Sequence, residues 1–303
     1  MISKYKLGEI TWVDVASPTR EEIRDLKESY SLPDLLCEEL LKRTPRSKAD
    51  RYKDQIYLVL HFPVRTDKSI REHEIDFVIG KSYVITVHYE PCFALERLTH
   101  SIEEKQLIKK SSIAEHPGFL FHNIIREIYL DVMNDLEKIN TKIRKIESRI
   151  FDSEEIKIVE AISHVNRDLV EFKQALRFHA DVLRSFSEAG ATFFGSSFVY
   201  HQSLINDEYN KIRTVLEGHK EILSDIRVTN DSLISVKTSK TIRFLTSLTF
   251  IILLLTLVTG FFAMNTSPQL LLIKTKANLV FVGGAMVLLV VVLIVYFKKK
   301  KWL

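Results

Sequence analysis

The residues that could do chemistry are polar side chains at the end of a long apolar segment. Residues 260–269 read GFFAMNTSPQ; they follow the apolar run FLTSLTFIILLLTLVT and precede a second apolar run. Within this stretch, Ala263, Met264 and Asn265 end the first run. A polar side chain here can contact a passing ion, or Asn265 can simply cap the helix. The residues alone leave both interpretations open.

Motifs for enzyme chemistry are missing from the sequence. Gly80-Lys81 lacks the upstream glycine and the Ser/Thr of a phosphate-binding loop, and Gly283-Gly284 lies inside the second apolar run. Neither H-E-x-x-H nor C-x-x-C occurs, and Cys37 and Cys92 are too few for a disulfide framework or a metal cluster. We expect no enzyme activity, no cofactor and two reduced cysteines.

Charge divides the 303-residue chain into two parts. Every Asp and Glu lies at or before Asp231, so residues 1–231 hold 34 basic against 39 acidic groups, a net charge of −5. Residues 232–303 carry nine basic groups and no acidic one. The formal +4 of the whole chain therefore belongs to an apolar tail. This pattern indicates a membrane protein and is poor evidence for nucleic-acid binding.

Two segments are long enough to cross a bilayer, 244–264 and 277–297. Basic residues flank them at 237–243 and 298–301, against two lysines in the loop 265–276. By the positive-inside rule, both termini and the basic tail 298–303 are expected in the cytoplasm. The start of the chain has no apolar signal-peptide core, so the N-terminal part is expected in the cytosol. The sequence predicts a multi-pass protein of the cell (inner or plasma) membrane.

Residues 1–110 are predicted to form a cytoplasmic α/β domain. Strand-like runs such as EITWVDV and QIYLVLHFPV alternate with helical patterns such as PTREEIRDLKESY. Thr19 and Glu22 form a capping box at a helix start, and Gly80-Lys81 joins a probable hairpin. Residues 111–243 are predicted to be long amphipathic helices and a stalk, with breaks near 152–153 and 188–197. The last helix, if unbroken to Met264, is about 100 Å long, and a helix of that length needs partners.

Several segments, in order along the chain, resemble the CorA family of divalent-cation channels, the two-transmembrane magnesium transporters. WVDVASPTREEIRDL resembles the family's opening strand and helix, and EIDFVIGKSYVITVH its sheet hairpin. LTSLTFIILLLTLVTGFFAMN resembles its pore helix and filter motif, which reads AMN here where the family has GMN, and VYFKKKKWL resembles its C-terminus. The resemblance covers essentially the whole chain.

The resemblance implies a funnel-shaped homopentamer, with a two-helix membrane hairpin and five long helices around one pore. It assigns a selectivity filter to Ala263, Met264 and Asn265, with Asn265 contacting a largely hydrated cation. An amide oxygen can accept a hydrogen bond from a coordinated water without stripping it. Further pore-lining positions are Ser239, Ile242, Thr246, Thr249, Leu253 and Thr256. The threonines could instead be packing residues that bond their own backbone.

Two departures from the family pattern bear on function. Ala263 replaces a glycine, and its Cβ disfavours left-handed geometry by about 1 kcal/mol or more. The loop between the spans has Gln269 and two lysines where the family has a carboxylate, so an approaching cation meets weak repulsion.

The function predicted from the resemblance is channel-type transport of hydrated Mg²⁺, with Co²⁺ or Ni²⁺ possible, driven by the membrane potential. The alternatives are a ZntB-like zinc transporter and a non-conducting, membrane-anchored sensor or scaffold. The expected partners are further copies of the chain, divalent cations and the lipid bilayer. The family also implies regulation by intracellular Mg²⁺, for which Asp207 and Glu208 are the candidate ligands, with a solvated helix face as the alternative. The sequence does not identify the ion or the regulatory ligands.

Overall fold

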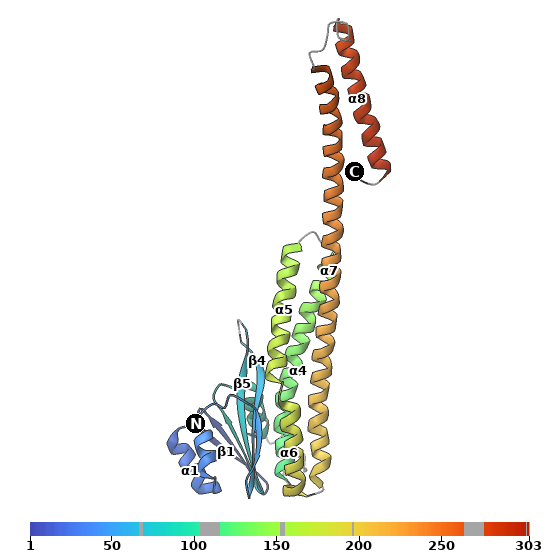
Figure 1. Ribbon diagram of the computed structural model, residues 1–303. Coiled ribbons are helices and arrows are strands. Elements are labelled where there is room, and N and C mark those ends of the chain that lie inside the picture. Colours follow the sequence, from blue (N-terminus) through green and yellow to red (C-terminus); the bar gives the residue numbers. More distant parts are fainter. Residues whose placement is uncertain are drawn as a thin grey trace. The chain divides into compact units, whose positions relative to one another are not determined.

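The computed structural model describes residues 1–66, 69–103, 116–151, 155–195, 197–263, 276–300 and 302 (Figure 1). The chain divides into two compact units, Met1–Ile226 and Arg227–Leu303. The first contains a sheet and most of the helices. The second contains the end of one long helix and the C-terminal helix.

A six-stranded sheet forms the centre of the first unit. Its strands are β1 (Ile2–Leu7), β2 (Ile10–Ala16), β3 (Lys48–Arg51), β4 (Gln55–Arg65), β5 (Ile70–Gly80) and β6 (Tyr83–His88). Their order is β1-β2-β6-β5-β4-β3, and β2 runs parallel to β6 while the other neighbours are antiparallel. The predicted α/β domain is confirmed, including the β5–β6 hairpin. Strands β1 and β3, which are short and mostly polar, were not predicted.

Two short helices cover one face of this sheet. They are α1 (Arg20–Tyr30) and α2 (Asp34–Glu39), and Thr19 and Glu22 cap α1 with the reciprocal bonds that the sequence predicted. Ile23 and Leu26 of α1 pack with Leu36 of α2 and with alternate strand residues such as Val59 and Val78. Burial of these apolar side chains is the main force that holds the helices to the sheet.

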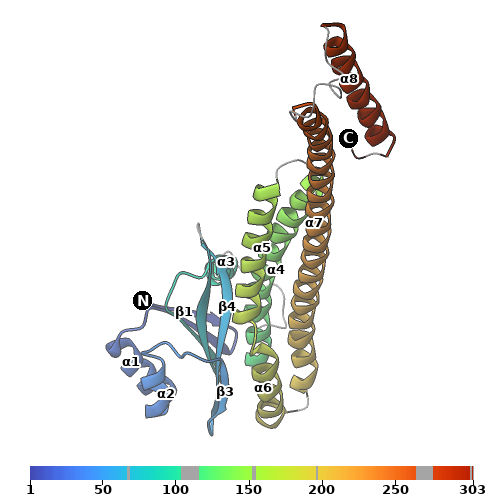
Figure 2. The same ribbon diagram turned by 45° about the horizontal axis from the view of Figure 1, so that its top comes forward.

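Other helices cover the opposite face, as Figures 1 and 2 both show. They are α3 (Phe93–Glu103), α4 (Pro117–Arg149), α5 (Glu155–Ala175) and α6 (His179–Phe194). Edge-to-face aromatic pairs connect the sheet to α4. The ring centroids of Phe77 and Phe121 lie 5.2 Å apart, and those of Phe62 and Tyr129 lie 5.8 Å apart. Such pairs add to the stabilisation by burial.

The sequence reading missed one helix break. It treated residues 155–186 as continuous, whereas α5 ends at Ala175 and α6 begins at His179. His179 is fully buried; its Nε2 lies 2.8 Å from the backbone oxygen of His61, and its Nδ1 lies 2.9 Å from the hydroxyl of Tyr129. Both bonds are formed if Nε2 carries the proton. We attribute the break to these long-range contacts, because the local sequence contains no Gly or Pro.

The helix α7 (Ser197–Ala263) is 67 residues long, and α8 (Lys276–Lys299) follows it. At 1.5 Å per residue α7 measures about 100 Å, the length predicted from the sequence. Among the described residues, one helix is long and apolar enough to cross a membrane, and it lies within Gln202–Phe261. The N-terminal α/β domain and the single long helix thus agree with the predicted fold class.

Candidate functional site

The six positions predicted to line a pore lie on one face of α7. Their spacing along the chain alternates between three and four residues, which places them in a single stripe on a helix. We call this set the open stripe: Ser239, Ile242, Thr246, Thr249, Leu253 and Thr256. All six side chains are exposed in the single chain, and the two large apolar ones, Ile242 and Leu253, are 57% and 61% exposed.

The other side of this part of α7 is partly covered. Ser247 and Ile251 are buried, and the ring of Phe250 meets the ring of Phe297 from α8 edge-on at 6.1 Å. At 3.6 residues per turn, Ser247 and Ile251 lie about half a turn away from Thr249 and Leu253. The buried positions therefore lie opposite the open stripe, and α8 leaves all six stripe residues exposed.

Each threonine of the open stripe bonds its own helix. The hydroxyls of Thr246, Thr249 and Thr256 donate to the carbonyl oxygens four residues earlier, at 2.8, 2.8 and 2.9 Å. This is the backbone bonding that the sequence offered as an alternative to pore lining. The two roles are compatible, because a hydroxyl that has donated its hydrogen still has lone pairs that accept hydrogen bonds. The stripe thus presents acceptor oxygens between apolar side chains.

The filter assignment falls mostly outside the described residues. Ala263 is the last residue of α7, whereas Met264 and Asn265 lie in the range 264–275, which the structure does not describe. The same holds for Gln269. The roles assigned to these residues stay predictions.

The regulatory metal assignment is also still a prediction. Asp207 is exposed on α7, and the carboxylate of Glu208 accepts a hydrogen bond from Nζ of Lys211 at 3.0 Å. Over the described ranges, no group of three or more His, Cys, Asp or Glu side chains is placed to hold a metal ion. The described residues of one chain therefore add no third His, Cys, Asp or Glu ligand to Asp207 and Glu208.

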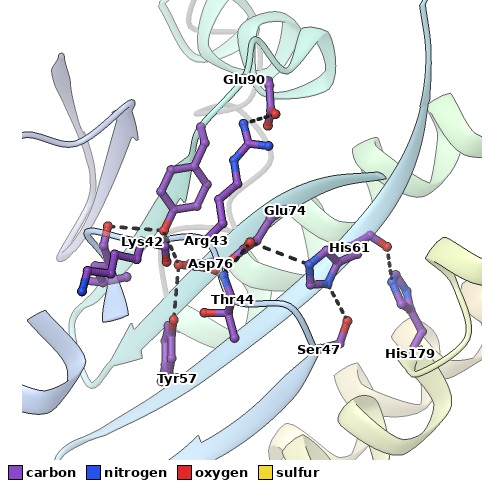
Figure 3. Close-up of polar contacts among 12 residues, drawn as sticks. Lys42, Arg43, Thr44, Ser47, Tyr57, His61, Glu74, Asp76, Glu90 and His179 are labelled. Carbon is purple, nitrogen blue, oxygen red and sulfur yellow. Dashed lines mark hydrogen bonds and ion pairs between the residues drawn. The ribbon is translucent and has the colours of Figure 1, made fainter. Parts of the chain in front are cut away.

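A second polar cluster, which the sequence reading missed, lies in the α/β domain beneath the loop that follows α2 (Figure 3). Glu74 and Asp76 project from one face of β5 and are 4% and 0% exposed. Both carboxylate oxygens of Glu74 accept from the backbone N–H of Thr44, at 2.8 and 2.9 Å. The hydroxyls of Tyr57 and Tyr89 both donate to Oδ2 of Asp76, at 3.2 Å.

Burial of the two carboxyls disfavours a negative charge on both of them. Oδ1 of Asp76 has no other hydrogen-bond partner in the described part of the chain. Burial raises the pKa of Glu74, and burial together with the negative charge of Glu74 raises the pKa of Asp76 well above its ordinary value. Protonation of one of the two carboxyls therefore removes a buried charge. Nε2 of His61 lies 3.7 Å from Oε2 of Glu74.

A signal for this pair exists in the sequence, although it is weak. In HEIDFVIG, the residues Glu74, Asp76 and Val78 alternate on one face of the strand, and Val78 belongs to the core under α1 and α2. Two acidic residues in phase with a core residue indicate burial of a carboxyl pair. The usual interpretation of such alternation is a solvent-exposed face.

Residues 8–299 match the family described as CorA-like Mg²⁺ transporter protein. The chain belongs to this family. The match confirms the resemblance, and since CorA-like proteins are divalent-cation transporters in the membrane, we do not expect an enzyme.

Relatives and a solved structure agree with the CorA-like assignment. The cobalt/magnesium transport protein CorA of Thermotoga maritima is 24% identical over 259 residues, 84% of this chain and 73% of that protein. The protein of the same name from Methanocaldococcus jannaschii is 23% identical over 283 residues, 88% of this chain and 85% of that protein. The complete structure of the CorA magnesium transporter from Methanocaldococcus jannaschii has a TM-score of 0.84 at 19% identity, covering 97% of this chain and 92% of that one. The fold is therefore shared over nearly the full length.

Proposed function

We propose that this CorA-like protein is a channel that conducts hydrated Mg²⁺ along a pore lined by the open stripes of several α7 helices. The observation that carries the proposal is the exposure of all six stripe residues, on the side of α7 away from the buried Ser247 and Ile251. An apolar and threonine-bearing face that its own chain leaves uncovered needs further copies of the chain or lipid. Copies arranged around an axis, five in the family, bury the stripes around a common path.

The chemistry of the stripe suits a hydrated cation. Mg²⁺ gives up its water ligands reluctantly, so a pore that conducts it without dehydration must accept hydrogen bonds from coordinated waters. Threonine oxygens whose hydrogens already bond the backbone are such acceptors. Ile242 and Leu253 supply apolar constrictions between these polar rings, which can close the path by dewetting.

The membrane arrangement proposed here is a hairpin of the 244–264 and 277–297 segments, with both termini in the cytoplasm. Arg243 precedes the first span, and the second ends at the basic run that starts at Lys298. The inside-negative potential then drives uptake, at about 2.3 kcal/mol per charge per 100 mV. The proposed domain order is the one expected from the sequence: 1–110 α/β domain, 111–243 stalk, 265–276 external loop and 298–303 tail.

Mg²⁺ is the proposed ion, with Co²⁺ second. Both relatives named above are cobalt/magnesium transport proteins, which favours these ions over the zinc of a ZntB-like transporter. The test is Mg²⁺ uptake into proteoliposomes that contain the purified full-length chain. We expect Asn265→Ala to abolish uptake and leave the oligomer intact, with Gln269→Ala as a control in the same loop. Wild-type uptake by Asn265→Ala would contradict the filter assignment.

A non-conducting role remains the second candidate because Ala263 replaces the family's glycine. If this Cβ weakens the filter, Ala263→Gly raises Mg²⁺ flux or sharpens inhibition by cobalt hexammine, an exchange-inert mimic of a hydrated ion. Flux that appears only in Ala263→Gly would favour the sensor or scaffold function for the natural chain.

Regulation by intracellular Mg²⁺ is proposed to act between subunits. Five copies of a part with net charge −5 repel one another, and divalent ions that bridge carboxylates such as Asp207 relieve that repulsion. Proteolysis of residues 1–231 in the intact oligomer should then be slower in millimolar Mg²⁺ than in EDTA. Equal rates would rule out closure of this kind.

A further inference from the structure

A cavity of about 360 Å³ opens in the first unit where α5 gives way to α6. The two α7 residues Tyr209 and Leu216 form one wall, and Leu169 and Leu176 lie opposite them. All four side chains are buried or nearly so. The volume lies within the range of small-molecule pockets, roughly 300 to 1,000 Å³.

Four basic side chains line the same cavity. Lys173 comes from the last turn of α5, Arg177 comes from the break that follows it, and Arg213 and Lys220 come from α7. The lining contains one carboxylate, Glu217, and that carboxylate already accepts from Nε of Arg213 at 2.9 Å. Within the described part of the chain, the other three basic groups form no ion pair. The guanidinium of Arg177 lies 4.9 Å from the ring of Phe178.

The cavity lining is positively charged, whereas the part of the chain that contains it has a net negative charge. Residues 1–231 carry a net charge of −5, so this part of the chain has more acidic than basic groups, and yet three basic groups here form no ion pair among the described residues. Like charges around one small cavity repel one another, and an anion inside it would relieve that repulsion. Ala180, in the first turn of the 16-residue helix α6, also lines the cavity, and a helix N-terminus favours negative charge.

The lining therefore combines a basic rim with an apolar and aromatic wall. We propose that this cavity binds a nucleoside polyphosphate, with its phosphates at Lys173, Arg177 and Lys220 and its base against the apolar wall. The break between α5 and α6, held by the buried His179, creates the space. Binding here does not depend on ion conduction, so the proposal is separate from the transport function.

Calorimetric titration of the full-length protein in detergent tests the site. The buffer contains EDTA, so that Mg²⁺ binding elsewhere does not contribute, and the probes are ATP, inorganic tripolyphosphate and adenosine. We expect ATP to bind more tightly than tripolyphosphate, and adenosine to show no measurable binding. Tripolyphosphate bound as tightly as ATP, or adenosine bound as tightly as ATP, would overturn the proposal.

Two double variants that lose the same amount of charge test whether ATP binds in this cavity. Lys173→Gln with Lys220→Gln removes two rim groups, whereas Lys145→Gln with Arg167→Gln removes two exposed groups on α4 and α5 outside the cavity. Loss of a charge-assisted hydrogen bond costs roughly tenfold in affinity, so the rim variant should bind ATP at least about tenfold more weakly. The control should stay within about twofold. Equal affinity in both variants would overturn the proposal, and the single variant Lys173→Gln, with about a tenfold loss, provides the test if the double rim variant melts early.

Discussion

The two parts of α7 use the same periodicity for different purposes. In the first unit, a stripe of residues with alternating spacing is buried: Phe198, Gln202, Ile205, Tyr209, Ile212, Leu216, His219, Leu223 and Ile226. In the second unit, the open stripe from Ser239 to Thr256 has the same spacing and is exposed. Helical spacing thus identifies a face that packs, but it does not say whether the partner is the same chain.

The side chains of the two stripes differ in size and in how they satisfy polar groups. The buried stripe, from Phe198 to Ile226, contains large aromatic residues. Phe198 packs so closely on Gly118 and Gly190 that a Cβ at either glycine would overlap its ring. The open stripe contains no aromatic residue, and three of its six members are threonines that bond their own backbone. A small, self-satisfied polar side chain remains compatible with water, whereas a bulky aromatic one needs a fitted partner.

The largest expected effect tests the open stripe by chemical labelling. In Leu253→Cys, a cationic thiol reagent should reduce Mg²⁺ uptake by about tenfold or more, because it places a bulky positive group in the proposed constriction. The matched control is Leu248→Cys, which is exposed on α7 outside both the open stripe and the buried face. Burial raises the pKa of Cys37 and raises that of Cys92 to about 11, so the native thiols react slowly. Equal inhibition of both variants would contradict the assignment of Leu253 to the pore.

The next prediction tests the buried stripe through the stability of the protein. Phe198→Ala should lower the free energy of unfolding by about 3 kcal/mol or more, since it leaves a cavity among the rings of Phe186 and Phe194 and the two glycines. The control Val228→Ala, at a position 65% exposed, should change stability by less than about 0.5 kcal/mol. Thermal melting of the full-length protein measures both. A similar loss in the control would mean that the loss in Phe198→Ala does not come from the packing of its ring.

The third prediction concerns the acid stability of the helix break. Burial lowers the pKa of His179 to about 4, against about 6.5 in the unfolded chain. Its contribution is therefore present above about pH 6.5 and is lost as the pH falls toward 4, by up to about 3 kcal/mol. His179→Gln should flatten this part of the stability profile, whereas Gln at the exposed His164 should leave it unchanged. An unchanged slope in His179→Gln would contradict the assignment of a neutral, buried imidazole.

The smallest effect has the opposite sign and comes from Asp76. Its pKa is raised in the folded protein, so the native state binds a proton that the unfolded chain releases above about pH 4. Stability should therefore fall as the pH rises from about 4 through the raised pKa. Asp76→Asn keeps an acceptor for Tyr57 and a donor for Glu74 and removes this loss. A melting temperature that drops with rising pH as much in Asp76→Asn as in the natural chain would exclude a protonated Asp76.

The sequence by itself determined the elements with strong local signals. The capping box at Thr19, the β5–β6 hairpin and the 67-residue helix α7 follow from residue types and spacing that act over a few positions. The order of family-like segments also identified the CorA-like family before any fold was known. These features depend on neighbours in the chain, which a sequence records directly.

Only the tertiary structure decided the features that depend on distant contacts. The break at 176–178 follows from the hydrogen bonds of His179 with Tyr129 and with the backbone of His61. These partners lie 50 and 118 positions earlier in the chain, so no local pattern shows them. The burial of Glu74 and Asp76 depends on the loop at Thr44 and on two tyrosines from other strands or loops. The cavity between α5, α6 and α7 depends on that same break. In each case the deciding energy comes from desolvating or pairing a polar group, and that energy is fixed only when the partners are brought together in space.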